Sequence, residues 1–242
     1  MGGAVARALA REGAKVHLAG RTLESLEEVA EQIRSAGGAA ETAQVDALDE
    51  TAVGEHPDAV AERAGSIDIS INLISCADLQ GTPLAQMPLE DFERPVVSAV
   101  RTQFLTSRAA ARHMVRQGSG VILTFGGAGG RDPIRDYASG GFQVYLGGFQ
   151  VALGANEVLR RQLAVELGPH GIRVVTLQSG GVPETTREDW HEAITQSFVE
   201  TSMLKRAETL EDVGNVAAFA ASDLARTITA TAINITAGRV AD

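Results

Sequence analysis

The stretch GGFQVALGANEVLRRQLAVELGPHGIRVVTLQSGG (147–181) decides the fold. Apolar residues recur in its first part at steps of three and four, which places them on one face of a helix. Gly168-Pro169 ends that helix, and the β-branched run Ile172–Leu177 is typical of a buried parallel strand. The apolar positions of the helix are Val151, Ala155, Val158, Leu159, Leu163 and Leu167.

Another β-branched run, Gly120–Phe125, precedes the helix, so the stretch indicates a strand, a helix and a second strand. The same alternation continues in both directions along the chain. We therefore predict an α/β fold of one domain, 1–242, with a Rossmann-like, doubly wound, mostly parallel sheet and helices on both faces. The expected strands are 15–19, 39–45, 67–75, 120–125, 172–177 and 231–236. The expected helices are 2–13, 23–36, one that closes over 58–64, then 89–117, 149–167 and 208–222.

Composition limits the classes of partner and site. With 44% hydrophobic and 21% charged residues, the chain has the makeup of an ordinary globular domain. A net charge of −10 argues against a nucleic-acid or anionic-membrane partner. The single Cys76 and the absence of a signal-peptide pattern or a membrane-length apolar run lead us to expect a cytoplasmic protein. The five histidines show no metal-binding spacing, so we expect no metal site.

The chain resembles the short-chain dehydrogenase/reductase family over essentially its whole length. The resemblance rests on the strand, glycine turn and helix around 120–167, followed by Ala164-x-Glu166-Leu167-x-x-x-Gly171-Ile172-Arg173-Val174. It implies an NAD(P)-dependent oxidoreductase that acts on CH–OH or C=O groups. It also implies a catalytic Ser at the end of strand 120–125, a Tyr-x-x-x-Lys motif at the start of helix 149–167, and an Asn in helix 89–117.

None of these four residues occupies its expected position. The matching positions are Gly127 for Ser, Phe149 for Tyr, Leu153 for Lys and Ala99 for Asn. A tyrosine near pKa 10 needs a neighbouring cation to work as an acid or base near neutral pH. The sequence therefore predicts an atypical or catalytically silent member of the family.

The absence of the motif does not depend on an alignment. The tyrosines are Tyr137 and Tyr145, and four residues after them stand Gly141 and Phe149 rather than lysine. Tyr145 lies one helical turn before Phe149 and is our candidate for a remaining proton donor. The alternative is that Tyr145 packs in a loop.

The resemblance also implies a set of cofactor-binding positions. Arg21 stands where an acid would select NAD, so NADP is favoured over NAD if a dinucleotide binds. Asp46 matches an acid that accepts from the adenine amino group, but it could instead cap the next helix. Ser75 replaces a glycine that lets the backbone approach the cofactor. The full set of matching positions is Gly2, Arg21, Asp46, Ala47, Asn72, Gly180 and Val182.

The family begins with a strand and a glycine-rich turn, and Gly2 matches the last glycine of that turn. We expect either a truncated form or misplaced start, or a sheet that closes over the gap, and we expect dinucleotide binding to be doubtful in either case. A short repeat, 140–144 and 147–151, lies just before the long helix, and we interpret its first copy as a loop insertion.

Three functions remain open at this level. They are a divergent NADP-dependent oxidoreductase, a catalytically silent binding or oligomer-partner protein, and a non-redox enzyme. Each would use a cleft near Ser75, 126–130 and 180–185, beneath the segment 188–205. The resemblance further implies a homo-oligomer, a dimer or tetramer, that pairs helices 89–117 and 151–167. The small residues that would permit close approach are Ala109, Ala110, Ala111, Ala152 and Ala155.

Overall fold

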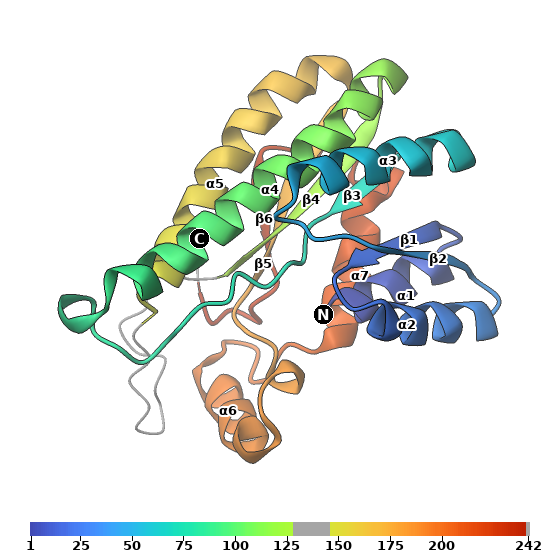
Figure 1. Ribbon diagram of the computed structural model, residues 1–242. Coiled ribbons are helices and arrows are strands. Elements are labelled where there is room, and N and C mark those ends of the chain that lie inside the picture. Colours follow the sequence, from blue (N-terminus) through green and yellow to red (C-terminus); the bar gives the residue numbers. More distant parts are fainter. Residues whose placement is uncertain (128–145, 241–242) are drawn as a thin grey trace.

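A computed structural model describes residues 1–127 and 146–240 (Figure 1). Strands and helices alternate through this part of the chain, as the sequence predicts. The strands are β1 (Lys15–Gly20), β2 (Ala39–Gln44), β3 (Ile69–Ile71), β4 (Gly120–Gly127), β5 (Ile172–Ser179) and β6 (Thr231–Asn234). The helices are α1 (Gly2–Arg11), α2 (Leu23–Ser35), α3 (Glu50–Ala64), α4 (Leu89–Gln117), α5 (Gly148–Leu167), α6 (Glu188–Thr201) and α7 (Leu210–Ala221).

Every strand pair is parallel, which confirms the predicted fold class. The strands do not form one sheet, however, and this corrects the prediction of a single six-stranded sheet. They form a four-stranded sheet of order β3-β4-β5-β6 and a separate two-stranded sheet, β1-β2. The predicted strand 67–75 is also too long, because only Ile69–Ile71 pairs with β4. The break between the two sheets falls between β1 and β3.

Helices cover both faces of the larger sheet (Figure 1). Strand residues alternate between these faces, as period-two geometry requires. Ile122 and Val174 pack with residues of α4 and α5. Their neighbours Leu123 and Val175 pack on the opposite side, with residues of α1 and α7.

Helix α5 buries only part of the face that its apolar residues suggest, because Leu167 and Leu163 pack in the core but the residues nearer its start do not. Val151 and Val158 are 43% and 62% exposed. The buried side instead includes Glu157 and Arg160, whose side chains form an ion pair of 2.8 Å. Glu157 also accepts a hydrogen bond of 2.6 Å from the Thr176 hydroxyl on β5. Buried charges are tolerated when they are paired and hydrogen-bonded, and this network explains the rotated helix face.

Candidate functional site

The carboxyl ends of the parallel strands gather most of the predicted site positions at one edge of the molecule. Arg21 follows β1, Asp46 follows β2 and Asn72 follows β3. Gly127 ends β4, and Gly180 follows β5. Ligands of doubly wound folds bind at this edge, so the fold puts these residues where a ligand site is expected.

Gly127 and Leu153 face each other at the centre of this edge. A Cβ atom added to Gly127 would lie only 2.7 Å from Cδ1 of Leu153. Leu153 is 8% exposed, so the surroundings leave its side chain little room to move. The positions of the family's Ser and Lys are therefore adjacent in space, and a leucine methyl group fills the volume between them.

The other two positions of the expected catalytic set lie on helices. Phe149 is the second residue of α5 and is partly buried. Ala99 lies within α4, and its carbonyl accepts a hydrogen bond from the Thr102 hydroxyl. Tyr145 lies outside the described residues, as do Tyr137 and the first copy of the repeat. Phe149, Leu153 and Ala99 carry no side-chain group that transfers a proton.

Asn72 stabilises the turn after β3. It is 8% exposed, its amide donates to the Thr106 hydroxyl on α4 at 3.1 Å, and its carbonyl oxygen accepts from the Ile74 amide. Ser75 is exposed, and its hydroxyl accepts from the Ala77 amide. Asn72 therefore holds the turn against α4, while the Ser75 side chain lies at the surface near the site.

Arg21 and Asp46 lie at the ends of the two-stranded sheet. Asp46 accepts from the Leu48 amide at 3.0 Å, and the residue that caps α3 is Asp49. The alternative that Asp46 caps the helix is therefore wrong. Arg21 is exposed, and within the ranges 1–127 and 146–240 its guanidinium has no hydrogen-bond or ion-pair partner. Ala47, the next predicted position, packs with the cluster around Val53.

Both backbone polar groups of Gly180 are occupied by side chains that the sequence analysis missed. The Gly180 amide donates to Oε1 of Glu208 at 2.6 Å, and its carbonyl accepts from Arg239 at 2.8 Å. These partners lie 28 and 59 residues along the chain, and no local sequence pattern signals them. Val182 is 2% exposed and packs in the core with Val5 of α1, so its side chain does not face the cleft.

Glu208 has the most strongly altered acidity of the carboxyl groups near this edge. Burial raises the pKa of Glu208 to about 7, although the Gly180 amide, the Ser179 hydroxyl and Arg239 each act to lower it. The neighbouring Asp212 raises it further. The Arg239 guanidinium also lies over the Phe198 ring of α6, 3.6 Å from its centroid. Glu208 and Arg239 thus tie the Gly180 turn to the segment before α7 and to the segment after β6, and Arg239 also contacts α6.

These residues only partly fit the dinucleotide that the family uses. At the adenosine end, Arg21 offers a guanidinium that has no partner among the described residues, and Gly2 begins α1 in open space. At the nicotinamide end, Leu153 replaces an ammonium group, Gly180 has no free backbone group in the hydrogen bonds above, and Val182 is buried. The residues at the nicotinamide end therefore do not fit the cofactor, whereas those at the adenosine end do.

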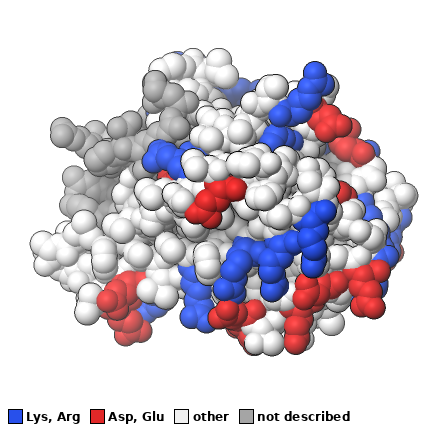
Figure 2. Space-filling view, turned by 90° about the horizontal axis from the view of Figure 1, so that it is seen from above, with Lys and Arg blue, Asp and Glu red and all other residues white. Residues whose placement is uncertain are grey.

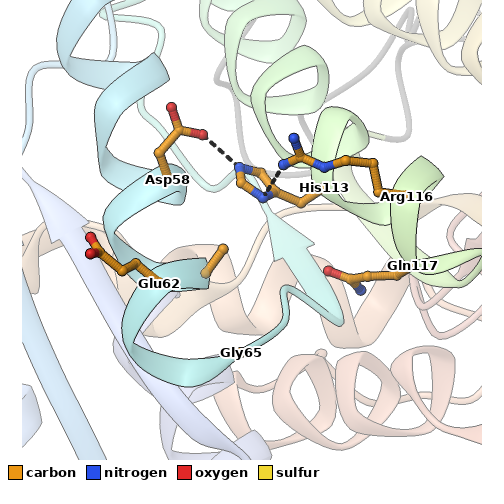
Figure 3. A pocket seen from close by; sticks show the side chains of 7 residues that line it. Asp58, Glu62, Gly65, His113, Arg116 and Gln117 are labelled. Atoms are coloured by element: carbon orange, nitrogen blue, oxygen red, sulfur yellow. Dashed lines mark hydrogen bonds and ion pairs between the residues drawn. The ribbon is translucent and has the colours of Figure 1, made fainter.

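A separate pocket of about 550 Å³ lies at the opposite edge of the sheet, where α3 and α4 end (Figure 3). His113 lies between Asp58 and Arg116 there, at 2.7 Å and 2.8 Å. Because Arg116 can only donate, Nδ1 of His113 accepts and Nε2 donates to Asp58. This arrangement joins α3 to α4, and it includes none of the predicted site residues. The lining residues are Asp58, Ala61, Glu62, Gly65, His113, Arg116 and Gln117.

Comparisons with known proteins identify the family. The family described as enoyl-(acyl carrier protein) reductase matches residues 1–239. The chain therefore belongs to the short-chain dehydrogenase/reductase family. It is 30% identical to a 3alpha-hydroxysteroid dehydrogenase of Mediterraneibacter gnavus, over 97% of this chain and 90% of the relative. It is 29% identical to a meso-2,3-butanediol dehydrogenase of Serratia marcescens, over 100% of this chain and 90% of the relative.

Solved structures agree with this placement. The structure of levodione reductase superposes with a TM-score of 0.86 at 26% identity and covers 98% of this chain and 92% of its own. A short-chain type dehydrogenase/reductase from Mycobacterium ulcerans gives a TM-score of 0.86 at 27% identity, over 98% of this chain and 85% of its own. None of the helices that the structure describes has the length and apolarity of a membrane span. No cluster of metal-ligating side chains occurs among the same residues.

Proposed function

We propose that this chain is an atypical short-chain dehydrogenase/reductase that does not reduce carbonyl groups by the family's mechanism. Its role under this proposal is to bind a small molecule in the cleft at the carboxyl ends of the strands. The contact between Gly127 and Leu153 carries the proposal, because it fills the place of the family's Ser and Lys with apolar atoms. Phe149 in place of the family's Tyr also supports it.

Two other functions remain open, and specific observations favour the first of them. An oxidoreductase that uses NADP is favoured by the family membership and by the exposed Arg21, with Tyr145 as its candidate proton donor. A non-redox enzyme would use the same cleft without a dinucleotide. Cofactor binding separates these functions, because hydride transfer requires it and the other two do not.

We expect NADPH to bind weakly or not at all. The measurement is a titration that follows the fluorescence of NADPH, with NADH in parallel. If weak binding is seen, Arg21→Ala should weaken NADPH more than NADH, because the guanidinium would pair with the 2′-phosphate. A submicromolar dissociation constant for NADPH would overturn the proposed loss of the cofactor site.

We also propose that the chain assembles as a homo-oligomer, a dimer or tetramer, through α4 and α5. The small residues expected at this interface do not support it, because Ala109, Ala110 and Ala152 are buried within the subunit. An exposed apolar stripe on the same helices does support it. The stripe consists of Val97, Phe104, Val151, Val158 and Val165, which are 58%, 44%, 43%, 62% and 72% exposed. On the face shown in Figure 2, basic and acidic side chains lie beside one another, which gives no support to a nucleic-acid partner.

Val158→Glu is expected to lower the mass of the particle to that of a smaller oligomer or the monomer, because it puts a charge in the centre of this stripe. Light scattering at micromolar concentration measures the change. Leu224→Glu is the matched control, because Leu224 is 84% exposed but lies outside α4 and α5. A wild-type monomer, or equal masses for wild type and Val158→Glu, would contradict the proposed interface.

A further inference from the structure

Helix α6 is attached to the rest of the molecule by few buried side chains. It lies apart from the helices that cover the two faces of the larger sheet (Figure 1). Of the residues of α6, all of which the structure describes, Phe198 alone is buried. The Arg239 guanidinium lies 3.6 Å from the centroid of the Phe198 ring, and the Leu204 amide, just after α6, donates to the Ala237 carbonyl at 3.1 Å. The segment after β6 therefore helps to hold α6 in place.

Arg239 is connected to Glu208 by the turn that follows β5. Arg239 donates to the Gly180 carbonyl at 2.8 Å, and Oε1 of Glu208 accepts from the Gly180 amide at 2.6 Å. A Cβ atom added to Gly180 would lie 3.1 Å from Nη1 of Arg239 and 3.2 Å from Oε1 of Glu208, so the two side chains enclose the turn. Glu208, Gly180 and Arg239 thus form a clamp that joins the segment before α7 to α6.

The carboxyl group of Glu208 is poorly placed to carry a charge. Glu208 is 4% exposed, and within residues 1–127 and 146–240 its Oε2 atom has no hydrogen-bond partner. A carboxylate loses much of its hydration at such a position, which costs free energy. Burial accordingly raises the pKa of Glu208 to about 7.

The charged groups around the clamp do not remove this cost. Arg239 acts to lower the pKa of Glu208 but does not reverse the shift. Asp212 acts to raise it, and the Arg206 guanidinium is paired with Asp212 at 2.8 Å. Glu184, from the other side, accepts from the first amide of α7 at 2.6 Å. Ionisation of Glu208 therefore adds a charge to a segment that already contacts two carboxylates.

We propose that ionisation of Glu208 opens this clamp, so that the turn around Gly180 and helix α6 detach locally as the pH rises. The neutral carboxyl group stays buried beside Gly180, whereas the charged carboxylate gains free energy by moving into water. That movement takes the acceptor from the Gly180 amide and disturbs the contacts of Arg239 with the turn and with α6. Helix α7 stays in place, because the capping box of Thr209 and Asp212 fixes its start without Glu208. The clamp does not depend on which molecule the cleft binds.

The direction of the effect follows from the state in which Glu208 holds its proton. In the open state the carboxyl group meets water and has the usual glutamate pKa of 4.5, whereas in the closed state its pKa is about 7. Between these values the closed state keeps a proton that the open state releases, so the closed state loses its advantage as the pH rises to 7. The ratio of open to closed molecules should rise by up to about tenfold per pH unit across this interval and stay level above it.

Hydrogen exchange of the backbone amides over 180–201, followed by mass spectrometry at pH 5 and pH 8, tests the proposal. Protection is the exchange rate of this segment in the urea-unfolded chain divided by its rate in the folded chain at the same pH. This ratio cancels the effect of pH on the chemistry of exchange. Wild-type protection is expected to fall at least about tenfold between pH 5 and pH 8. The amides of β4 should stay protected for longer at both pH values, because the opening is local.

Two variants assign the change to Glu208. Glu208→Gln keeps the acceptor for the Gly180 amide and cannot ionise, so its protection should be the same at both pH values. Glu211→Gln, the matched control, removes an exposed carboxyl group three residues away and should behave as the wild type does. Equal wild-type protection at pH 5 and pH 8 would overturn the proposal even if Glu208→Gln does not fold. An equal fall in Glu208→Gln would also overturn it, as would exchange over 180–201 at the rate of β4, which would indicate global unfolding.

Discussion

The triple variant Gly127→Ser, Phe149→Tyr and Leu153→Lys is expected to reduce cyclohexanone with NADPH at least about 10²-fold faster than the wild-type chain. Hydride delivery to a carbonyl leaves an alkoxide that must be protonated as it forms. General acid catalysis of that kind contributes about 10²–10⁴-fold. The tyrosine would supply the proton, the lysine would lower its pKa, and the serine would hold the oxygen. The measurement is the initial rate at an excess of NADPH, because we expect binding to be weak.

The three changes must be made together. A serine at 127 alone would overlap the Leu153 methyl group, so Gly127→Ser is expected to destabilise the fold by about 1–3 kcal/mol. The matched control carries Met instead of Lys at 153, which keeps an unbranched side chain but removes the ammonium group. If this control is as fast as the triple variant, the cation does not tune the tyrosine, and the reasoning fails.

The wild-type rate is itself decisive. Ketone reduction by the unchanged chain at ordinary rates, about 1–10³ s⁻¹, would show that another residue donates the proton. Tyr145 is the candidate for that role. If Tyr145→Phe then left the rate unchanged, both the proposed loss of the family mechanism and the candidate residue would be wrong.

Glu208→Gln is expected to make the folded chain more stable above neutral pH and to change its stability little near pH 5. The pKa of Glu208 is raised to about 7 in the folded state, so the folded state holds a proton that the unfolded state releases at lower pH. Stability therefore falls as pH rises from the usual glutamate value to about 7. The loss is about 3 kcal/mol when that interval is converted to free energy. Glutamine keeps the acceptor for the Gly180 amide and cannot ionise.

Urea unfolding of both proteins at pH 5 and pH 8.5 measures the difference. Other groups titrate in both proteins and cancel in the comparison. Glu211→Gln is the control, because Glu211 is an exposed carboxyl group in the first turn of α7, three residues after Glu208. If the free energy of unfolding changes equally between pH 5 and pH 8.5 in wild type and Glu208→Gln, ionisation of Glu208 does not destabilise the folded state, and the prediction is wrong.

The sequence predicts the elements of this fold well, because their periodicity and end signals are local. The helix expected over 89–117 has those bounds in the structure, with Gly118 in the left-handed conformation at its end. Which side of a helix is buried is predicted less well. Val151 and Val158 are as apolar as core residues, but the Glu157–Arg160 pair occupies the buried side, and such pairing depends on contacts with β5.

The positions of the candidate site also fall into those that the sequence predicts and those that it does not. Positions set by strand ends, such as Arg21, Asn72 and Gly127, lie at the expected edge because parallel strands finish there together. Gly180 and Val182 also follow β5, but their availability to a ligand could not be predicted. It depends on Glu208 and Arg239, which come from distant segments, and on packing of Val182 against α1.

The break between the two sheets has a consequence for how the molecule opens. In the described part of the chain no ladder of backbone hydrogen bonds joins β1 to β3, so side-chain packing, chiefly of α1 on α7, holds the two parts together. Directional backbone bonds therefore do not couple the unfolding of β1-β2 to that of β3-β6. We therefore expect the chain to unfold as two cooperative units, so that amide protons of β1 and β2 exchange with solvent through openings that leave those of β4 and β5 protected.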